Sequence, residues 1–83
     1  MTREEVCAYI RQNFNELQVA VYDAMAKEMA RLTPEEVCEK FLSGREGTEF
    51  DLFSIDALAE GHEEIMDLFC YIALHQLQLG EQA

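Results

Sequence analysis

The sequence has few basic side chains, and none of them lies after Arg45. Its 83 residues include 17 Asp and Glu but only 6 Lys and Arg, which gives a formal net charge of -11. Proteins bind DNA, RNA and anionic membrane surfaces chiefly through Lys and Arg. The shortage of these residues therefore predicts that the chain binds neither nucleic acid nor a membrane surface directly.

Two further absences bear on where the protein resides. No apolar run approaches the roughly 18 residues that a transmembrane helix needs, and the acidic start Met-Thr-Arg-Glu-Glu is unlike a signal peptide. The cysteines Cys7, Cys38 and Cys70 are odd in number and far apart, which argues against a disulfide framework or a zinc-binding pattern. We expect three reduced thiols in the helical core and a cytoplasmic location.

Candidate catalytic and metal-binding residues are equally scarce. The only histidines, His62 and His75, would lie about 20 Å apart along one helix and cannot share a site within one protomer. No Glu-x-x-His pair of the di-iron kind occurs. The sequence from Asp51 onward lacks the alternating oxygen ligands of an EF-hand. We therefore expect no enzymatic activity, no catalytic residues, no metal site and no cofactor.

What the sequence does contain is helical periodicity, which predicts an all-α fold. Apolar residues make up 49% of the chain. They recur every three or four residues from Val6 to Leu32, which is the spacing of one helical face. Thr2 and Glu5 form a capping box in front of this run. The pattern predicts a long first helix over 3–32.

The length of that first helix leaves two arrangements open. Thirty residues make a helix of about 45 Å, whereas a compact domain of this size is roughly 30 Å across. Either the helix breaks near Asn13, with Asn15 as a new cap, or it continues and the domain is elongated. We favour an elongated domain in which a second copy of the chain covers the overhang, as a homodimer.

Three shorter helices are expected to complete a small bundle of about four helices in a single domain, 1–83. Thr33 is a good helix cap and Pro34 suits the first helical position, so a helix begins there. Breaks are expected at Gly61 and Gly80, because glycine favours helix ends. The expected ranges of the three helices are 34–43, 51–60 and 62–79.

The last of these helices has a wide apolar face. Its apolar residues cover an arc of roughly 180–200°, where an ordinary amphipathic helix needs only about 100°. Such a helix lies at the centre of a bundle, contacted on two sides, or at an interface between proteins. Gln76 falls inside the apolar arc and needs a hydrogen-bond partner if it is buried.

The acidic charge is concentrated in the second half of the chain. Residues 1–45 hold 8 acidic and 6 basic side chains, whereas residues 46–83 hold 9 acidic and no basic ones. Eight of those nine lie within 46–67. They are Glu46, Glu49, Asp51, Asp56, Glu60, Glu63, Glu64 and Asp67. This density either maintains solubility or forms a negative surface that binds a basic one.

Together these features predict a non-enzymatic acidic protein-interaction module, which docks its acidic 46–67 region on a basic, Lys/Arg-rich partner protein. A nucleic-acid-binding protein suits this role, because the carboxylates can occupy the track of the phosphates. In size and acidity the chain resembles phage-encoded inhibitors of restriction and CRISPR systems, a resemblance of class that implies a nucleic-acid mimic. The alternative is a structural or regulatory helical homodimer whose acidic surface serves only solubility.

Overall fold

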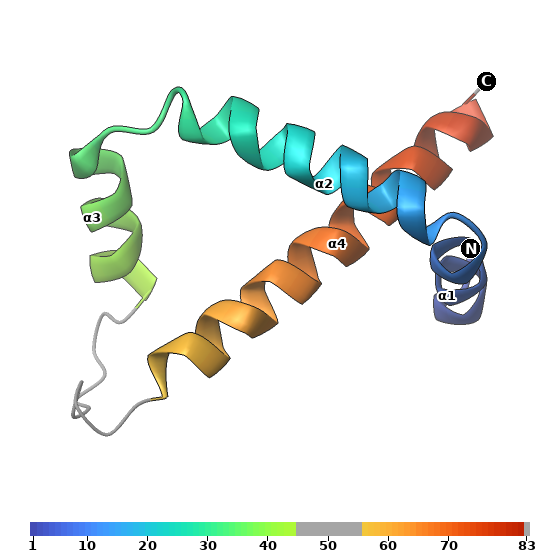
Figure 1. Cartoon of the computed structure of the whole chain (residues 1–83), viewed down its shortest axis with the longest axis horizontal. Helices are drawn as coiled ribbons and strands as arrows, with labels where there is room; N and C mark the ends of the chain where they lie inside the picture. The colour runs from blue at the N-terminus through green and yellow to red at the C-terminus, as the bar shows by residue number, and fades with distance from the viewer. Residues whose placement is uncertain (45–55, 83) are drawn as a thin grey trace.

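The computed structural model describes residues 1–44 and 56–82, which form helices joined by short connections (Figure 1). The helices are α1 (Arg3–Gln12), α2 (Phe14–Met29), α3 (Pro34–Gly44) and α4 (Ala57–Gln82). The expected all-α fold is confirmed, since no residue in the described ranges lies in a strand. Within these ranges, no helix combines the length and the apolar character that crossing a bilayer requires.

The expected first helix over 3–32 is not continuous, because the helical conformation is interrupted at Asn13. Asn13 has φ -124° and ψ 28°, outside the helical region. Its Nδ2 donates to the Tyr9 carbonyl at 2.9 Å, and its backbone N–H donates to the same carbonyl at 3.0 Å. Such local side-chain bonding competes with the helical pattern. Asn13 itself, and not Asn15, is therefore the junction between α1 and α2.

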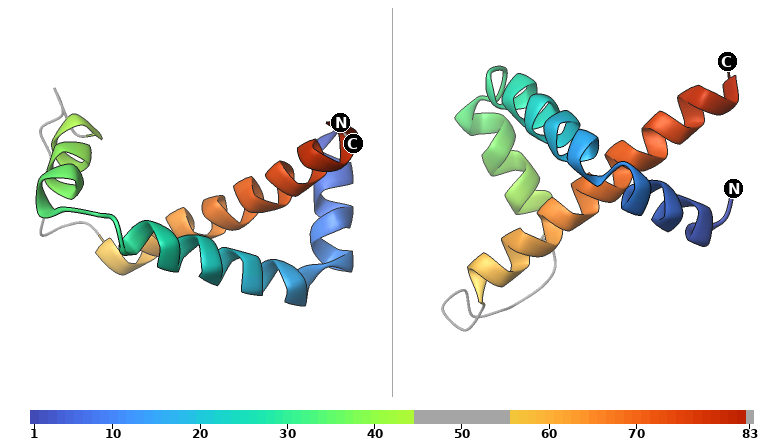
Figure 2. Two further views of the ribbon diagram at one scale, coloured as in Figure 1. Left: turned by 90° about the horizontal axis from the view of Figure 1, so that it is seen from above. Right: turned by 45° about the vertical axis from the view of Figure 1, so that its right-hand side comes forward.

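The break allows α1 and α2 to pack separately against α4. Figure 2 shows the two segments meeting at an angle beside α4, and both contact it. Leu17 and Val21 of α2 are buried together with Ala73 of α4. The ring of Phe14 stacks on Phe69 of α4, with centroids 5.2 Å apart. The central position expected for the last helix is thus confirmed.

The last helix is longer than expected, because neither Gly61 nor Gly80 interrupts it. It runs as one 26-residue element, where the sequence predicted a break between 51–60 and 62–79. A glycine inside a helix costs about 1 kcal/mol relative to alanine. That cost is smaller than the loss of helical hydrogen bonds that a break at Gly61 would bring.

The start of α4 is fixed by Asp56. The Asp56 Oδ1 accepts the backbone N–H of Ala59 at 3.2 Å, and the Asp56 carbonyl accepts the N–H of Glu60 at 3.1 Å. The start predicted for the helix over 51–60 lies outside the described residues. Asp56 therefore serves as the helix cap as well as being one of the predicted acidic site residues.

The other predicted helix starts are confirmed. Thr2 Oγ1 accepts the N–H of Glu5 at 3.2 Å, and α1 begins at Arg3. Thr33 Oγ1 accepts the N–H of Glu36 at 3.2 Å, and the same hydroxyl donates to Glu36 Oε1 at 3.3 Å. The bonds from the backbone N–H groups of Glu5 and Glu36 each satisfy a donor that the first turn of a helix leaves unpaired.

The predicted partner of Gln76 is a tyrosine from α1. Gln76 is half-buried, and its Oε1 accepts the Tyr9 hydroxyl at 2.5 Å. Residues 9 and 76 are distant in the sequence, so this bond fastens α1 to the C-terminal half of α4. A polar side chain inside the apolar arc is therefore satisfied.

The described fold is open and elongated. Its radius of gyration is 15.8 Å, whereas a compact chain of this length has about 12 Å. The buried core among the described residues consists of Leu17, Val21 and Ala73. α3 contacts no other helix of the described ranges, and it stands apart from the crossing of α2 with α4 (Figure 1).

The three cysteines are free, but their expected place in the core is wrong, because all three are exposed. Cys38 lies on α3, against which no helix in residues 1–44 and 56–82 packs. Cys7 and Cys70 line an open groove between α1 and α4. The helical spacing correctly placed these thiols on the apolar faces of their helices. The core is small, however, and does not extend over the parts of those faces that carry the cysteines.

Candidate functional site

The uninterrupted course of α4 brings several predicted acidic residues onto one side of the helix. Four of them fall within an arc of about 100°: Glu60, Glu63, Glu64 and Asp67, all exposed. Asp56, also exposed, precedes them at the helix cap. We call these five residues the acidic face. The other predicted members, Glu46, Glu49 and Asp51, lie outside the described residues.

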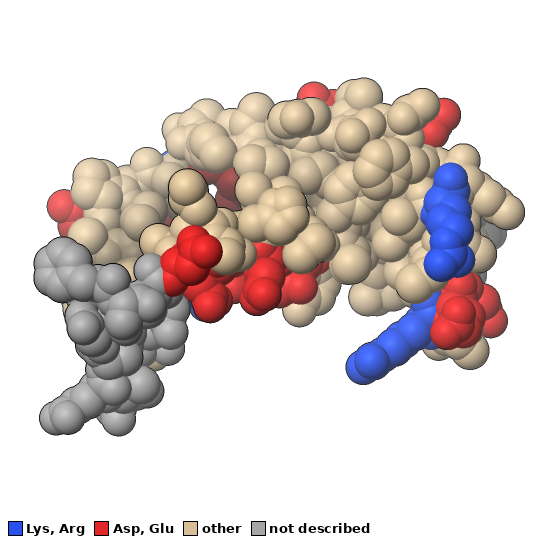
Figure 3. Space-filling model, turned by 60° about the horizontal axis from the view of Figure 1, so that its bottom comes forward, with Lys and Arg blue, Asp and Glu red and all other residues tan. Residues whose placement is uncertain are grey.

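No positive side chain on α4 offsets the acidic face, because the helix contains no Lys or Arg. In the described ranges the one ion pair joins Glu28, in the last turn of α2, to Arg31 just after the helix, and both side chains are exposed. In Figure 3 acidic side chains gather in the lower middle of the molecule, while the conspicuous Lys and Arg side chains lie at the right-hand end. The acidic face is therefore a surface of unbalanced negative charge.

The acidic face adjoins a groove between α1 and α4 with a volume of about 600 Å³. Asp67 belongs to both, since it lines the groove near its polar edge, as does Arg3 of α1. The remaining lining residues are apolar or weakly polar: Val6, Cys7, Ile10, Cys70, Tyr71 and Leu74. A partner side chain that approaches the acidic face thus finds apolar surface beside it.

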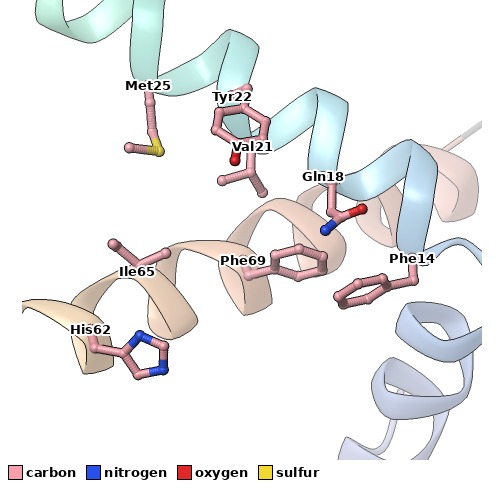
Figure 4. Close-up of a pocket in the computed structure, with 8 residues that line it drawn as sticks. All are labelled: Phe14, Gln18, Val21, Tyr22, Met25, His62, Ile65 and Phe69. Atoms are coloured by element: carbon pink, nitrogen blue, oxygen red, sulfur yellow. The ribbon is translucent and has the colours of Figure 1, made fainter. Parts of the chain in front are cut away.

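A second concave surface lies between α2 and α4, with a volume of about 380 Å³. We call it the apolar wedge. Its lining residues are Phe14, Gln18, Val21, Tyr22, Met25, His62, Ile65 and Phe69. In Figure 4 the rings of Phe14 and Phe69 meet at the closed end, and Met25 and Ile65 lie across from each other where the helices diverge. None of the lining residues is Asp, Glu, Lys or Arg.

A third uncovered surface is the apolar face of α3. Val37, Cys38, Phe41 and Leu42 are spaced so that they share one side of this helix. All four are exposed. An amphipathic helix in a globular protein buries such a stripe against a neighbour, and no helix of the described ranges lies against α3.

Sequence reasoning missed the wedge, although it noted the apolar faces of the two helices that form it. The wide apolar arc on the last helix was the available signal, and it is divided between the wedge side and the α1 side of α4. Met25 belongs to the apolar run from Val6 to Leu32, and it is only half-buried and lines the wedge. The angle between α2 and α4 determines how much of each face stays uncovered, and spacing along the chain does not specify that angle.

The histidines and carboxylates of the described ranges form no metal-binding cluster. No three His, Cys, Asp or Glu side chains there lie close enough together to hold a metal ion. His62 lines the wedge among mainly apolar neighbours, and His75 is exposed further along α4. Neither histidine is paired with a second candidate ligand.

Comparison with known proteins yields no relative. No known family, no curated protein and no solved structure matches the chain. The candidate site is therefore defined by the surfaces of this molecule: an acidic face on one side of α4, an apolar wedge on another side, and the uncovered face of α3.

Proposed function

We propose that the protein is a non-enzymatic interaction module whose acidic face binds a basic, Lys/Arg-rich surface of a partner protein. The observation that carries this proposal is the gathering of Glu60, Glu63, Glu64 and Asp67 on one side of an uninterrupted helix that holds no basic residue. Such a surface accelerates and orients the approach of an oppositely charged protein.

The density of these carboxylates supports a nucleic-acid-binding partner. From Glu60 to Asp67 the helix rises by about 10 Å, so four negative charges lie within about two turns, at successive rises of roughly 4.5, 1.5 and 4.5 Å. A surface that binds nucleic acid carries Lys and Arg side chains for the closely spaced phosphates. Such a surface also attracts a dense group of carboxylates. Bound there, the chain would block access of nucleic acid and act as an inhibitor.

The test uses DNA-binding proteins as the probe. They are taken from the native host of the protein and are retained on a column of double-stranded DNA. The wild-type chain is expected to release one such protein from the column at low salt, because its acidic face competes with the phosphates. A face variant, Glu60→Gln, Glu63→Gln, Glu64→Gln and Asp67→Asn, is expected to lose this effect. All four residues are exposed, so helical content in circular dichroism should be retained.

A matched control separates the acidic face from net charge alone. Four exposed acidic residues outside α4 are neutralised in the control: Glu4→Gln, Glu16→Gln, Asp23→Asn and Glu39→Gln. The control has the same net charge as the face variant and should still release the protein. Equal release by the wild-type chain and both variants would contradict the proposal, and so would release by none of them.

A second candidate function is a structural or regulatory homodimer, in which the acidic surface only maintains solubility. The observation that favours it is the amount of exposed apolar surface, which includes Tyr22 and Met29 of α2, Phe41 of α3 and Leu58 of α4. Apolar surface of this extent on a soluble chain marks an interaction site. The two candidates use different surfaces and are not exclusive.

A further inference from the structure

The apolar wedge and the apolar face of α3 are both uncovered in the described fold. Tyr22 and Ile65, on opposite walls of the wedge, are 72% and 49% exposed. Phe41 and Leu42 on α3 are 54% and 69% exposed. Leaving large apolar side chains in water forgoes about 25 cal/mol for each Å² that a partner could bury. Within residues 1–44 and 56–82, each chain therefore carries one apolar groove and one amphipathic helix that no other helix covers.

The exposed side chains of the two surfaces can be compared with the area that a stable interface needs. Six large apolar side chains of the wedge and of α3 are about half exposed or more: Phe14, Tyr22, Ile65, Val37, Phe41 and Leu42. Half of the roughly 200 Å² that a large side chain buries is about 100 Å², so the six leave on the order of 600 Å² per chain to be covered. A standard interface buries about 800 Å² on each partner, so these side chains supply most of the area of a dimer contact.

We propose that the apolar wedge of one chain binds the apolar face of α3 from a second copy of the same chain. The inference rests on the second candidate function, self-association, and is independent of the acidic face. Two copies related by a two-fold axis would each supply one helix and one wedge, so that one symmetric contact covers all four surfaces.

The shapes of the two surfaces fit a helix-in-groove contact. Val37 and Phe41 lie one turn apart on α3, the spacing with which an amphipathic helix anchors in an apolar groove. The wedge offers the aromatic surfaces of Phe69 and Tyr22, together with Met25, whose unbranched side chain adapts to the shape of a partner.

The contact buries no unpaired charge. The wedge lining contains no Asp, Glu, Lys or Arg. On α3, Glu36 and Glu39 lie on the side away from the apolar face, and Glu35 lies at its edge beside Leu42, where it can stay in solvent. On α4, the wedge residues His62, Ile65 and Phe69 lie about 180° around the helix from the acidic face. A second copy can therefore occupy the wedge while both acidic faces stay in solvent.

The first experiment weakens each half of the contact in turn. Phe41→Asp changes α3, Tyr22→Asp changes the wedge, and the control Val19→Asp changes an exposed apolar residue of α2 outside the wedge. All three add the same charge. In sedimentation equilibrium the wild-type chain is expected to dimerise at micromolar concentration. The Phe41 and Tyr22 variants should each raise the dissociation constant by about 30-fold or more, as interface hot spots do.

The control and the helical content decide how that result is interpreted. Val19→Asp should change the dissociation constant by less than about threefold, and all variants should keep the wild-type circular dichroism, since the three residues are exposed. A wild-type chain that stays monomeric would overturn the proposal. Equal weakening by all three variants would also overturn it, because net charge would then be the cause. If only Tyr22→Asp weakens the dimer, the wedge takes part in the contact but α3 does not bind there, and the proposed pairing of α3 with the wedge is rejected.

A second experiment tests which chain supplies α3, using two chains that both carry Cys7→Ser and Cys70→Ser. The first chain keeps Cys38 on α3. The second chain, larger by a tag, carries Cys38→Ser and His62→Cys. Mild oxidation of the mixture is expected to join the two chains into one mixed dimer that a reducing agent separates. The control is a single chain that carries both Cys38 and His62→Cys. If this chain forms an intramolecular disulfide instead of a disulfide to a second chain, the proposal that α3 comes from the second copy is overturned.

Discussion

The two sides of α4 carry opposite kinds of surface. One side bears Glu60, Glu63, Glu64 and Asp67 and stays in solvent, whereas the other packs on α2 and then opens into the wedge. The contrast arises because α4 is continuous through Gly61, which keeps its angular pattern in register over 26 residues. A single helix can therefore present a charged surface and an apolar surface to two different partners.

The largest expected effect concerns the apolar side, where α2 and α4 cross. Leu17 is fully buried, so Leu17→Ala removes packed methyl groups and leaves a cavity. The free energy of unfolding should fall by about 3 kcal/mol. Urea denaturation followed by circular dichroism measures this change. Val19→Ala, at an exposed position of the same helix, should change it by less than about 0.5 kcal/mol. Similar losses at both positions would mean that the crossing is not the stabilising part of the fold.

A second prediction uses salt to distinguish the two sides of α4. Each chain has a net charge of -11, so two copies repel each other while their apolar surfaces associate. Raising NaCl from about 0.05 to about 0.5 M shortens the screening length severalfold. The dimer should therefore tighten by roughly tenfold, about 1.4 kcal/mol. Sedimentation equilibrium at both salt concentrations measures it, and a dimer that loosens with salt would assign self-association to ion pairs.

The smallest expected effect is on stability and arises at the acidic face. Like charges three or four residues apart on a helix destabilise it by about 0.2–0.5 kcal/mol per pair. Neutralising Glu60, Glu63, Glu64 and Asp67 should therefore raise the free energy of unfolding, by up to about 1 kcal/mol at low salt. The gain is reduced because Glu60, in the first turn, interacts favourably with the helix dipole. Thermal unfolding in low salt measures the gain, and a less stable variant would show that the carboxylates support the fold.

Local signals predicted the helix starts and the all-α class well. The caps at Thr2 and Thr33 act within one turn, so neighbouring residues determine them. The break at Asn13 was recognised as a possibility but not chosen, because seven apolar steps of helical spacing outweighed one asparagine. Packing against α4 favours the break. Two shorter helices can both contact α4, whereas one straight helix over 3–32 would extend beyond it.

Two other expectations failed, one because of the local energetics of the helix and one because it depended on distant parts of the chain. A break at Gly61 was inferred from residue preference, but continuing the helix costs less than stopping it. The cysteines were placed in a core because they share apolar faces, yet Cys38 lies on α3, which no described helix covers. Spacing along a chain identifies a face, and only the tertiary arrangement decides whether something packs on it. The wedge was missed for the same reason.

The most direct test of the proposed function is the salt dependence of binding to a protein released from the DNA column. Affinity is measured for the wild-type chain, the face variant and the control with equal net charge, between about 0.05 and about 0.5 M NaCl. The account predicts that the wild-type chain and the control bind tightly at low salt and weaken steeply as salt rises. The face variant should bind weakly with a much flatter dependence. Superimposable curves for the face variant and the wild-type chain would contradict the account.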